Sequence, residues 1–230
     1  MPFSSFANRA ALEAELIEKT VMYLEAGLAA RDSALLVVSG GNTPVPLFNK
    51  LARVPLPWHK ISVTLADERW VAPDDPRSNE RLLRESLLTG HAASAQFVGL
   101  KSTHATPEQG QPAINSRLAT LPWPADIILL GMGEDGHFAS LFPDSNELLT
   151  AMTDCSQRRC CAINSATAGV ARISLTLPTL LETHFLALHI VGVEKRQALS
   201  RAQQCGSITG MPVRALFQQK LTALNIFWAP

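Results

Sequence analysis

The chain has 230 residues, of which 47% are hydrophobic and 17% charged, so it can bury a sizeable core and is not a disordered sequence. Twenty Lys and Arg residues balance twenty Asp and Glu residues, which leaves no net field to attract nucleic acid or an anionic membrane surface. Any anion that the protein binds must therefore be held locally. The length suits one α/β domain over residues 1–230.

Charged residues recur through the first thirty positions and interrupt any apolar stretch that could serve as a signal peptide or membrane span. The cysteines show neither a CxxC pair nor a neighbouring histidine at metal-ligand spacing. They are Cys155, Cys160, Cys161 and Cys205. We therefore expect a cytoplasmic protein with reduced thiols and without a metal site.

Hydrophobic periodicity predicts alternating helices and strands. An amphipathic helix is expected over residues 10–28, ending near Gly27, and a strand buried on both faces at Ala34–Val38. A short helix should follow Pro44. Next come a strand at Ile61–Leu65 and a helix over residues 79–88. Further strands are predicted at residues 96–99, Ile127–Leu130, Arg172–Leu175, residues 185–191 and residues 224–227, with helices between most of them.

The segment 143–169 has weaker periodicity, and we interpret it as a loop with at most one short strand at Cys160–Ile163. Strands that alternate with helices imply right-handed crossovers. The sequence therefore predicts a Rossmann-like α/β fold, in which a doubly wound, mostly parallel sheet carries helices on both faces. Ligands bind such sheets beyond the carboxyl ends of the strands.

A glycine-rich turn follows the first predicted strand, with Ser39, Gly40 and Gly41 leading to Thr43 and Pro44. The glycines allow the backbone to approach an anion, Thr43 is expected to be the helix N-cap, and Pro44 suits the first helical position. Backbone N–H groups at a helix N-terminus could then hold a phosphate. The alternative is an ordinary strand-to-helix turn; a Walker loop is excluded because no GK[ST] ending is present.

Charged residues end the second predicted strand, at Asp67, Glu68 and Arg69. Arg offers bidentate contacts to phosphate or carboxylate, and Asp can act as an acid or base. The alternative is a solvated surface ion cluster.

The loop after Ile127–Leu130 contains three glycines, two carboxylates and His137. His137 is the best candidate for a general base, because histidine changes protonation near neutral pH and Asp135 can orient its ring. The other histidines lack such a loop, and we interpret them as structural. They are His59, His91, His104, His184 and His189.

Two basic residues lie near the ends of later strands. Arg172 begins a predicted strand, and Lys195 follows the end of the strand predicted at residues 185–191. Each alone would be a solvated charge, but together they could supply the cations that a neutral protein needs to hold a phosphate.

These segments together resemble the 6-phosphogluconolactonase family, within a wider group of sugar-phosphate proteins that includes glucosamine-6-phosphate deaminase. The resemblance covers most of the chain from about residue 35 onward. The matching stretches are SGGNTP at residues 39–44, DERWV at 67–71, SN at 78–79, LGMGEDGH at 130–137, ASLFP at 139–143 and GVEK at 192–195.

The resemblance implies hydrolysis of 6-phosphoglucono-δ-lactone to 6-phosphogluconate in the oxidative pentose phosphate pathway. We expect the protein to act as a monomer and to need no metal or organic cofactor. His137 would take a proton from the attacking water, and Asp67 and Asp135 would orient His137 or that water. Arg69 would hold a developing oxyanion or a substrate hydroxyl. The phosphate would be held by residues 39–43 together with Arg172 and Lys195.

Two alternatives remain open from the sequence. Deaminases of the group carry a Glu five residues beyond the loop His, whereas Phe142 stands here and cannot move protons. A non-catalytic sugar-phosphate sensor would keep the phosphate site but would not need His137. The sequence also departs from the lactonase pattern before Arg172, where prolines are common in the family but residues 168–171 read AGVA.

Overall fold

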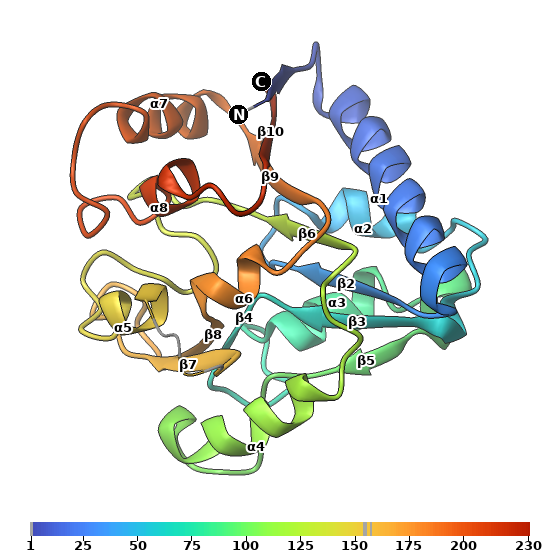
Figure 1. Ribbon diagram of the computed structural model, residues 1–230, viewed down its shortest axis with the longest axis horizontal. Helices are drawn as coiled ribbons and strands as arrows, with labels where there is room; N and C mark the ends of the chain where they lie inside the picture. The colour runs from blue at the N-terminus through green and yellow to red at the C-terminus, as the bar shows by residue number, and fades with distance from the viewer. Residues whose placement is uncertain (1, 154–155, 157) are drawn as a thin grey trace.

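A computed structural model describes residues 2–153, 156 and 158–230 (Figure 1). The elements in chain order are β1 (Phe3–Ser5), α1 (Arg9–Arg31), β2 (Ala34–Val38), α2 (Val45–Leu51), the 3-10 helix η1 (Trp58–Lys60), β3 (Ile61–Leu65), β4 (Asp67–Arg69), α3 (Asn79–Ser86), η2 (Gly90–Ser94), β5 (Gln96–Val98), α4 (Pro107–Ala119), β6 (Ile127–Leu130), α5 (Leu148–Thr153), β7 (Cys160–Ile163), β8 (Arg172–Leu175), α6 (Leu177–Leu181), β9 (Leu186–Val191), α7 (Val193–Ala202), α8 (Arg214–Gln218) and β10 (Leu224–Ala229).

The central sheet has seven strands in the order β1-β10-β9-β6-β2-β3-β5, and every pairing in it is parallel. From β2 the chain proceeds outward to β3 and β5, then returns to β6 and proceeds the other way to β9 and β10. The direction of winding therefore reverses between β2 and β6, and in open α/β sheets this switch point is where ligands bind. The predicted Rossmann-like α/β fold is confirmed.

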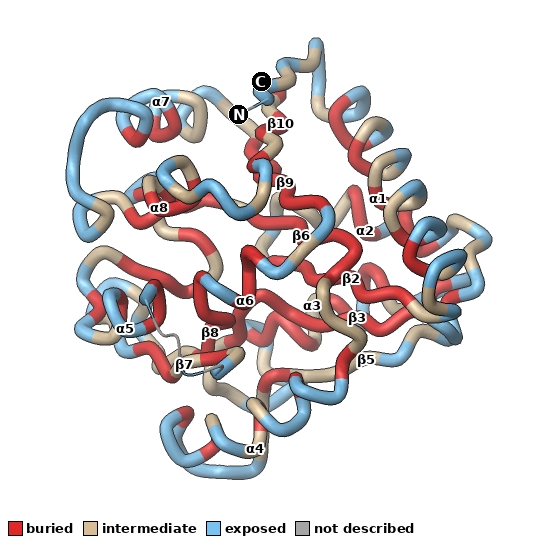
Figure 2. Tube along the Cα trace, viewed as in Figure 1, coloured by how far each residue is buried: buried red, intermediate tan, exposed pale blue. Residues whose placement is uncertain are grey.

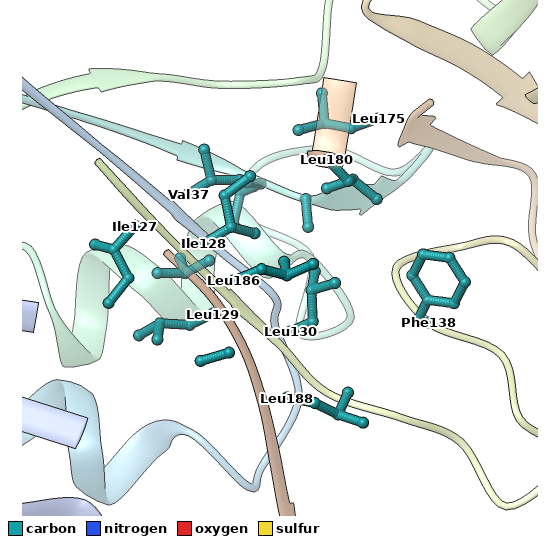
Figure 3. Close-up of a cluster of buried hydrophobic side chains, with 14 of the residues drawn as sticks. Val37, Ile127, Ile128, Leu129, Leu130, Phe138, Leu175, Leu180, Leu186 and Leu188 are labelled. Atoms are coloured by element: carbon teal, nitrogen blue, oxygen red, sulfur yellow. The ribbon is translucent and has the colours of Figure 1, made fainter. Parts of the chain in front are cut away.

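Apolar residues fill both faces of the sheet centre. Every residue of β2, β3 and β6 is buried, as Figure 2 shows in red. Side chains of Val37, Ile128 and Leu186 come from three neighbouring strands and lie together in the buried cluster of Figure 3. Helix α2 packs against both α1 and α3, whereas α5, α7 and α8 lie in the opposite half of Figure 1. No helix in the described part of the chain is both long and apolar enough to cross a membrane.

A second, smaller sheet of β4, β8 and β7 is antiparallel and was not anticipated. The strand at Arg172–Leu175 was predicted, but it pairs in this sheet rather than with the parallel strands. Strands β1 and β4 were missed because each has three residues, too few to show a period, and β4 consists of charged residues. The segment 143–169 contains the predicted strand β7 and also α5; residues 154–155 and 157 lie outside the described part.

Two helix boundaries differ from the sequence prediction. Helix α1 continues past Gly27 to Arg31, and its C-cap Asp32 lies in the left-handed region with φ 58°. A Cβ at Gly27 would collide with Asp126, so this glycine serves close packing and not the end of the helix. Thr43 is not the N-cap of α2: Pro44 occupies that position without a side-chain cap bond, and the Thr43 carbonyl accepts a hydrogen bond from Arg9 instead.

Of the thiols expected to be reduced, Cys160 and Cys205 are free, and Cys155 lies outside the described residues.

Candidate active site

A cavity of about 420 Å³ lies where the loops after β2, β6 and β9 meet. Its volume is within the range of small-molecule sites. All the predicted site residues except Asp135 line this cavity. The lining residues among them are Ser39, Gly40, Gly41, Thr43, Asp67, Arg69, His137, Arg172 and Lys195. The fold thus gathers residues that are spread over 157 positions of the chain, from 39 to 195, at one place.

The glycine-rich turn lies at the switch point between β2 and β6. The Ser39 N–H donates to the Leu129 carbonyl at 2.9 Å, which ties the start of the turn to the neighbouring strand. Gly41 has φ 92°, a conformation that residues with a side chain rarely adopt. A Cβ on Gly41 would meet no atom within 4 Å, so the backbone there is open to a ligand.

His137 is held by Asp135 two residues earlier. Its Nδ1 lies 2.6 Å from Asp135 Oδ1, and its backbone N–H donates to the same oxygen at 3.1 Å. Asp135 is behind His137 rather than in the cavity lining. A carboxylate can only accept hydrogen bonds, so Nδ1 carries the proton and Nε2 of the neutral ring holds a lone pair. In this tautomer the imidazole can accept a proton at Nε2.

Asp135 remains ionised at neutral pH. Partial burial alone would raise the pKa of Asp135, but the hydrogen bonds and charge of His137 outweigh burial and hold that pKa below its ordinary value. The approach of the ring depends on Gly133, since a Cβ there would collide with His137 Nδ1. The His137 side chain is 31% exposed, so water and substrate can reach it.

Asp67 is buried and bonded to groups other than His137. Ser140 Oγ donates a hydrogen bond to Asp67 Oδ2, and Arg172 Nη1 lies 4.0 Å from that oxygen. Of the two carboxylates assigned to orient His137 or the water, only Asp135 contacts the ring in the described residues. Asp67 thus fixes Ser140 and offsets part of the charge of Arg172.

Two arginines occupy opposite positions in the small sheet, because Arg69 on β4 pairs with Arg172 on β8. The Arg172 side chain is only 12% exposed. Burial lowers the pKa of Arg172, and the charge of Arg69 lowers it further, whereas Asp67 and Glu68 act in the opposite direction. Like charges at paired positions are unfavourable without a counter-ion, so this wall of the cavity suits an anion.

Phe142 lies beside both His137 and Arg172. Its ring centroid lies 4.3 Å from that of His137, and the Arg172 guanidinium carbon lies 5.6 Å from the same phenyl ring. The position that would carry a Glu in a deaminase thus supports the imidazole by apolar contact.

Lys195 lies in the first turn of α7, after Gly192, whose φ is 99°. Its Nζ is 3.7 Å from Glu134 Oε1, which links the cation to the loop that carries His137. Arg201 of the same helix donates to the Glu134 carbonyl at 2.9 Å and strengthens that link.

Three cavity or supporting residues were not assigned from the sequence. Asn79 accepts from Arg69 Nη1 and donates to the Asp67 carbonyl at 2.9 Å, so it orients both ends of β4. Ser140 holds Asp67. His189 lines the cavity although the sequence indicated a structural role. Asn79 and Ser140 lie inside the matching stretches quoted above, which was the available signal; no pattern pointed to His189.

No group of three or more His, Cys, Asp or Glu side chains within the described residues is arranged to hold a metal ion.

Comparison with known proteins identifies the lineage. The sequence profile of the glucosamine-6-phosphate isomerases/6-phosphogluconolactonase family matches residues 7–228. The chain belongs to this family. It is 40% identical over 225 residues to a 6-phosphogluconolactonase of Rhizobium meliloti, covering 98% of this chain and 97% of that protein. A 6-phosphogluconolactonase of Pseudomonas aeruginosa is 41% identical over 90% of this chain and 86% of its own length.

A solved structure agrees with the sequence comparison. The crystal structure of a 6-phosphogluconolactonase from Shewanella baltica matches with a TM-score of 0.97 and 41% identity, covering 100% of this chain and 98% of that one. The family assignment thus extends to the whole arrangement of strands and loops that forms the cavity.

Proposed function

We propose that this chain hydrolyses 6-phosphoglucono-δ-lactone to 6-phosphogluconate, the lactone-opening step of the oxidative pentose phosphate pathway, with water activated by His137. The chain is a lactone hydrolase of its family, as the full-length likeness to 6-phosphogluconolactonases indicates. The observation that carries the mechanism is the 2.6 Å contact between Asp135 and His137 Nδ1 at the edge of a cation-lined cavity.

The phosphate is bound at the glycine-rich turn. Gly41, with its open backbone, lines the cavity together with Ser39 and Lys195, and the largely buried Arg172 adds a guanidinium. Binding the phosphate away from the reacting carbon converts its binding energy into orientation of the lactone beside His137.

The path of the proton in the reaction follows from the tautomer of His137. With Nδ1 donating to Asp135, Nε2 accepts a proton from water as the oxygen attacks the lactone carbonyl. The imidazolium is stabilised by ionised Asp135 and then returns the proton to the ring oxygen as the tetrahedral intermediate collapses. A G-x-S-x-G nucleophile elbow is absent from the sequence, which favours direct attack by water over an acyl-enzyme.

The negative charge that develops on the carbonyl oxygen is stabilised by Arg69. Asn79 accepts from one nitrogen of this guanidinium and fixes its orientation, so the side chain is pre-organised before substrate binds. Asp67 orients the site through Ser140 and Arg172.

The test is acid release from freshly prepared 6-phosphogluconolactone in a pH-stat, above the spontaneous rate. His137→Ala should lower the rate by roughly 10²- to 10⁴-fold. His184→Ala is the matched control, because His184 is exposed and precedes the amino end of β9, far from the carboxyl ends that form the site. Absence of acceleration by the wild-type chain would refute the activity, and unchanged turnover in His137→Ala would refute the base.

We also propose that residues 1–230 form a single domain that acts as a monomer in the cytoplasm. Limited proteolysis without a stable fragment, elution at the monomer mass of 24.9 kDa and cell fractionation test the three parts of this proposal.

A further inference from the structure

Three buried side-chain atoms within the described residues have no hydrogen-bond partner, and they are Ser39 Oγ, Arg172 Nε and His189 Nε2. All three residues line the same cavity. A buried polar group left without a partner costs about 1–3 kcal/mol, so such groups are rare in folded proteins unless they have a role. Two of these residues already belong to the proposed phosphate site, which directs attention to the third.

His189 is 4% exposed and lies on β9, two residues before the strand ends. Leu188 pairs with Leu130 of the adjacent strand β6, so the next residue on each chain brings His189 beside Gly131. A Cβ on Gly131 would meet no atom within 4 Å, so that position is open space. Gly131 and His189 both line the cavity, and no side chain at 131 fills the space beside them.

The charged groups near His189 place it at the phosphate end of the cavity. Arg9 and Glu13 of α1 are the charges that act on the imidazole. Arg9 also donates to the carbonyl of Thr43, in the glycine-rich turn. Lys195 follows six residues after His189, across the turn at Gly192. His189 therefore shares the cavity with the turn and the lysine that hold the phosphate in the proposed function.

We infer that His189 donates a hydrogen bond to the phosphate of the substrate and so contributes to selection of phosphorylated lactones. This inference rests on the proposed function, and it adds a neutral donor to the cations Lys195 and Arg172. Burial lowers the pKa of His189 to about 4, so the ring is neutral at physiological pH and keeps one N–H to donate.

Four proteins test the inference: the wild type, His189→Leu, His189→Gln and, as the matched control, His184→Leu. The measurements are KM and kcat for 6-phosphogluconolactone and for unphosphorylated glucono-δ-lactone, together with the inhibition constant of inorganic phosphate. We expect His189→Leu to raise KM for the phosphorylated lactone and the phosphate inhibition constant roughly 10- to 100-fold, the range for a lost hydrogen bond to a charged group. Turnover of the unphosphorylated lactone should not change.

The conservative variant separates binding from packing. An amide nitrogen in His189→Gln can replace an imidazole donor, so part of the phosphate affinity should return. Equal constants for His189→Leu and His184→Leu, or equal losses with both lactones, would overturn the inference and leave His189 a packing residue.

A wild-type measurement covers the case in which the Leu variant fails to fold. Titration of the protein with inorganic phosphate should shift the imidazole nitrogen resonances of His189, identified by their absence in His189→Gln, with the same constant as inhibition. Unshifted resonances at saturating phosphate would overturn the inference. A shift in a chain that does not hydrolyse the lactone would refute the proposed function and still support the phosphate contact.

Discussion

Arg69 and Arg172 occupy paired positions on β4 and β8 and line one cavity, where Asp67 Oδ2 lies 4.0 Å from Arg172 Nη1. The arrangement is unfavourable without an anion and favourable with one. This pair supplies the local positive charge that the proposed binding of a phosphorylated substrate requires in a chain with no net charge.

Removing one of the two guanidiniums should separate stability from binding. In Arg172→Met, inorganic phosphate should bind at least about 10-fold more weakly, because charge-assisted hydrogen bonds are lost. The melting temperature without phosphate should fall little or rise, since repulsion from Arg69 is also removed. Thermal melts with and without phosphate measure both effects. A large loss of stability without phosphate would contradict the expectation that Arg69 and Arg172 repel each other.

Lys195 should act on the phosphate alone. We expect Lys195→Ala to raise KM for 6-phosphogluconolactone and to leave turnover of glucono-δ-lactone nearly unchanged, because the unphosphorylated lactone has no group for this ammonium. Steady-state kinetics with both lactones provides the comparison. Equal losses with both would show that the lysine instead supports the loop through Glu134, 3.7 Å away.

Asp135 should affect kcat by keeping the proton of His137 on Nδ1. Asp135→Asn can present an N–H to Nδ1 and leave the proton on Nε2, where it blocks the base, so kcat should fall by about 10²-fold or more with little change in KM. Asp74→Asn, at an exposed carboxylate, is the control. A kcat equal to that of the control would contradict an orienting role.

The pair of Asp135 and His137 should also contribute to stability in a pH-dependent way. Because His137 holds the pKa of Asp135 below its ordinary value, this contribution is present above about pH 4 and is lost only as the pH falls through that lowered pKa.

His189 should make the protein less stable in mild acid. Its pKa is about 6.5 in the unfolded chain and about 4 in the folded one, so between these values the unfolded state binds more protons. The free energy of unfolding should therefore fall as the pH drops from above 6.5 towards 4, by up to about 3 kcal/mol from this residue. Urea unfolding at pH 7.5 and pH 5 measures the fall, which should be smaller in His189→Leu. An identical fall in both proteins would show that other groups cause it.

Some of the candidate site could be predicted because its signals are local. The glycine-rich turn, the residues 67–69 and the loop around His137 each follow a buried apolar run, and parallel strands bring their carboxyl ends to one edge. The contact between Asp135 and His137 spans two residues and needs no long-range information.

Other parts could not be predicted because they depend on which strands pair. Asp67 accepts a hydrogen bond from Ser140, 73 positions further along the chain, and the sequence around neither residue predicts this bond. Thr43 was expected as the N-cap of α2, but Arg9 of another helix contacts its carbonyl and the helix begins two residues later.

The sequence by itself determined the α/β class and the parallel strands of the sheet and singled out His137 as the candidate base, because burial on both faces and glycine in turns are set by short-range chemistry. Only the tertiary structure decided that β8 leaves the parallel sheet for β4, which places Arg172 opposite Arg69, and that His189 lines the cavity. Strand pairing depends on competition among segments far apart in the chain, and local periodicity carries no information about which partner wins.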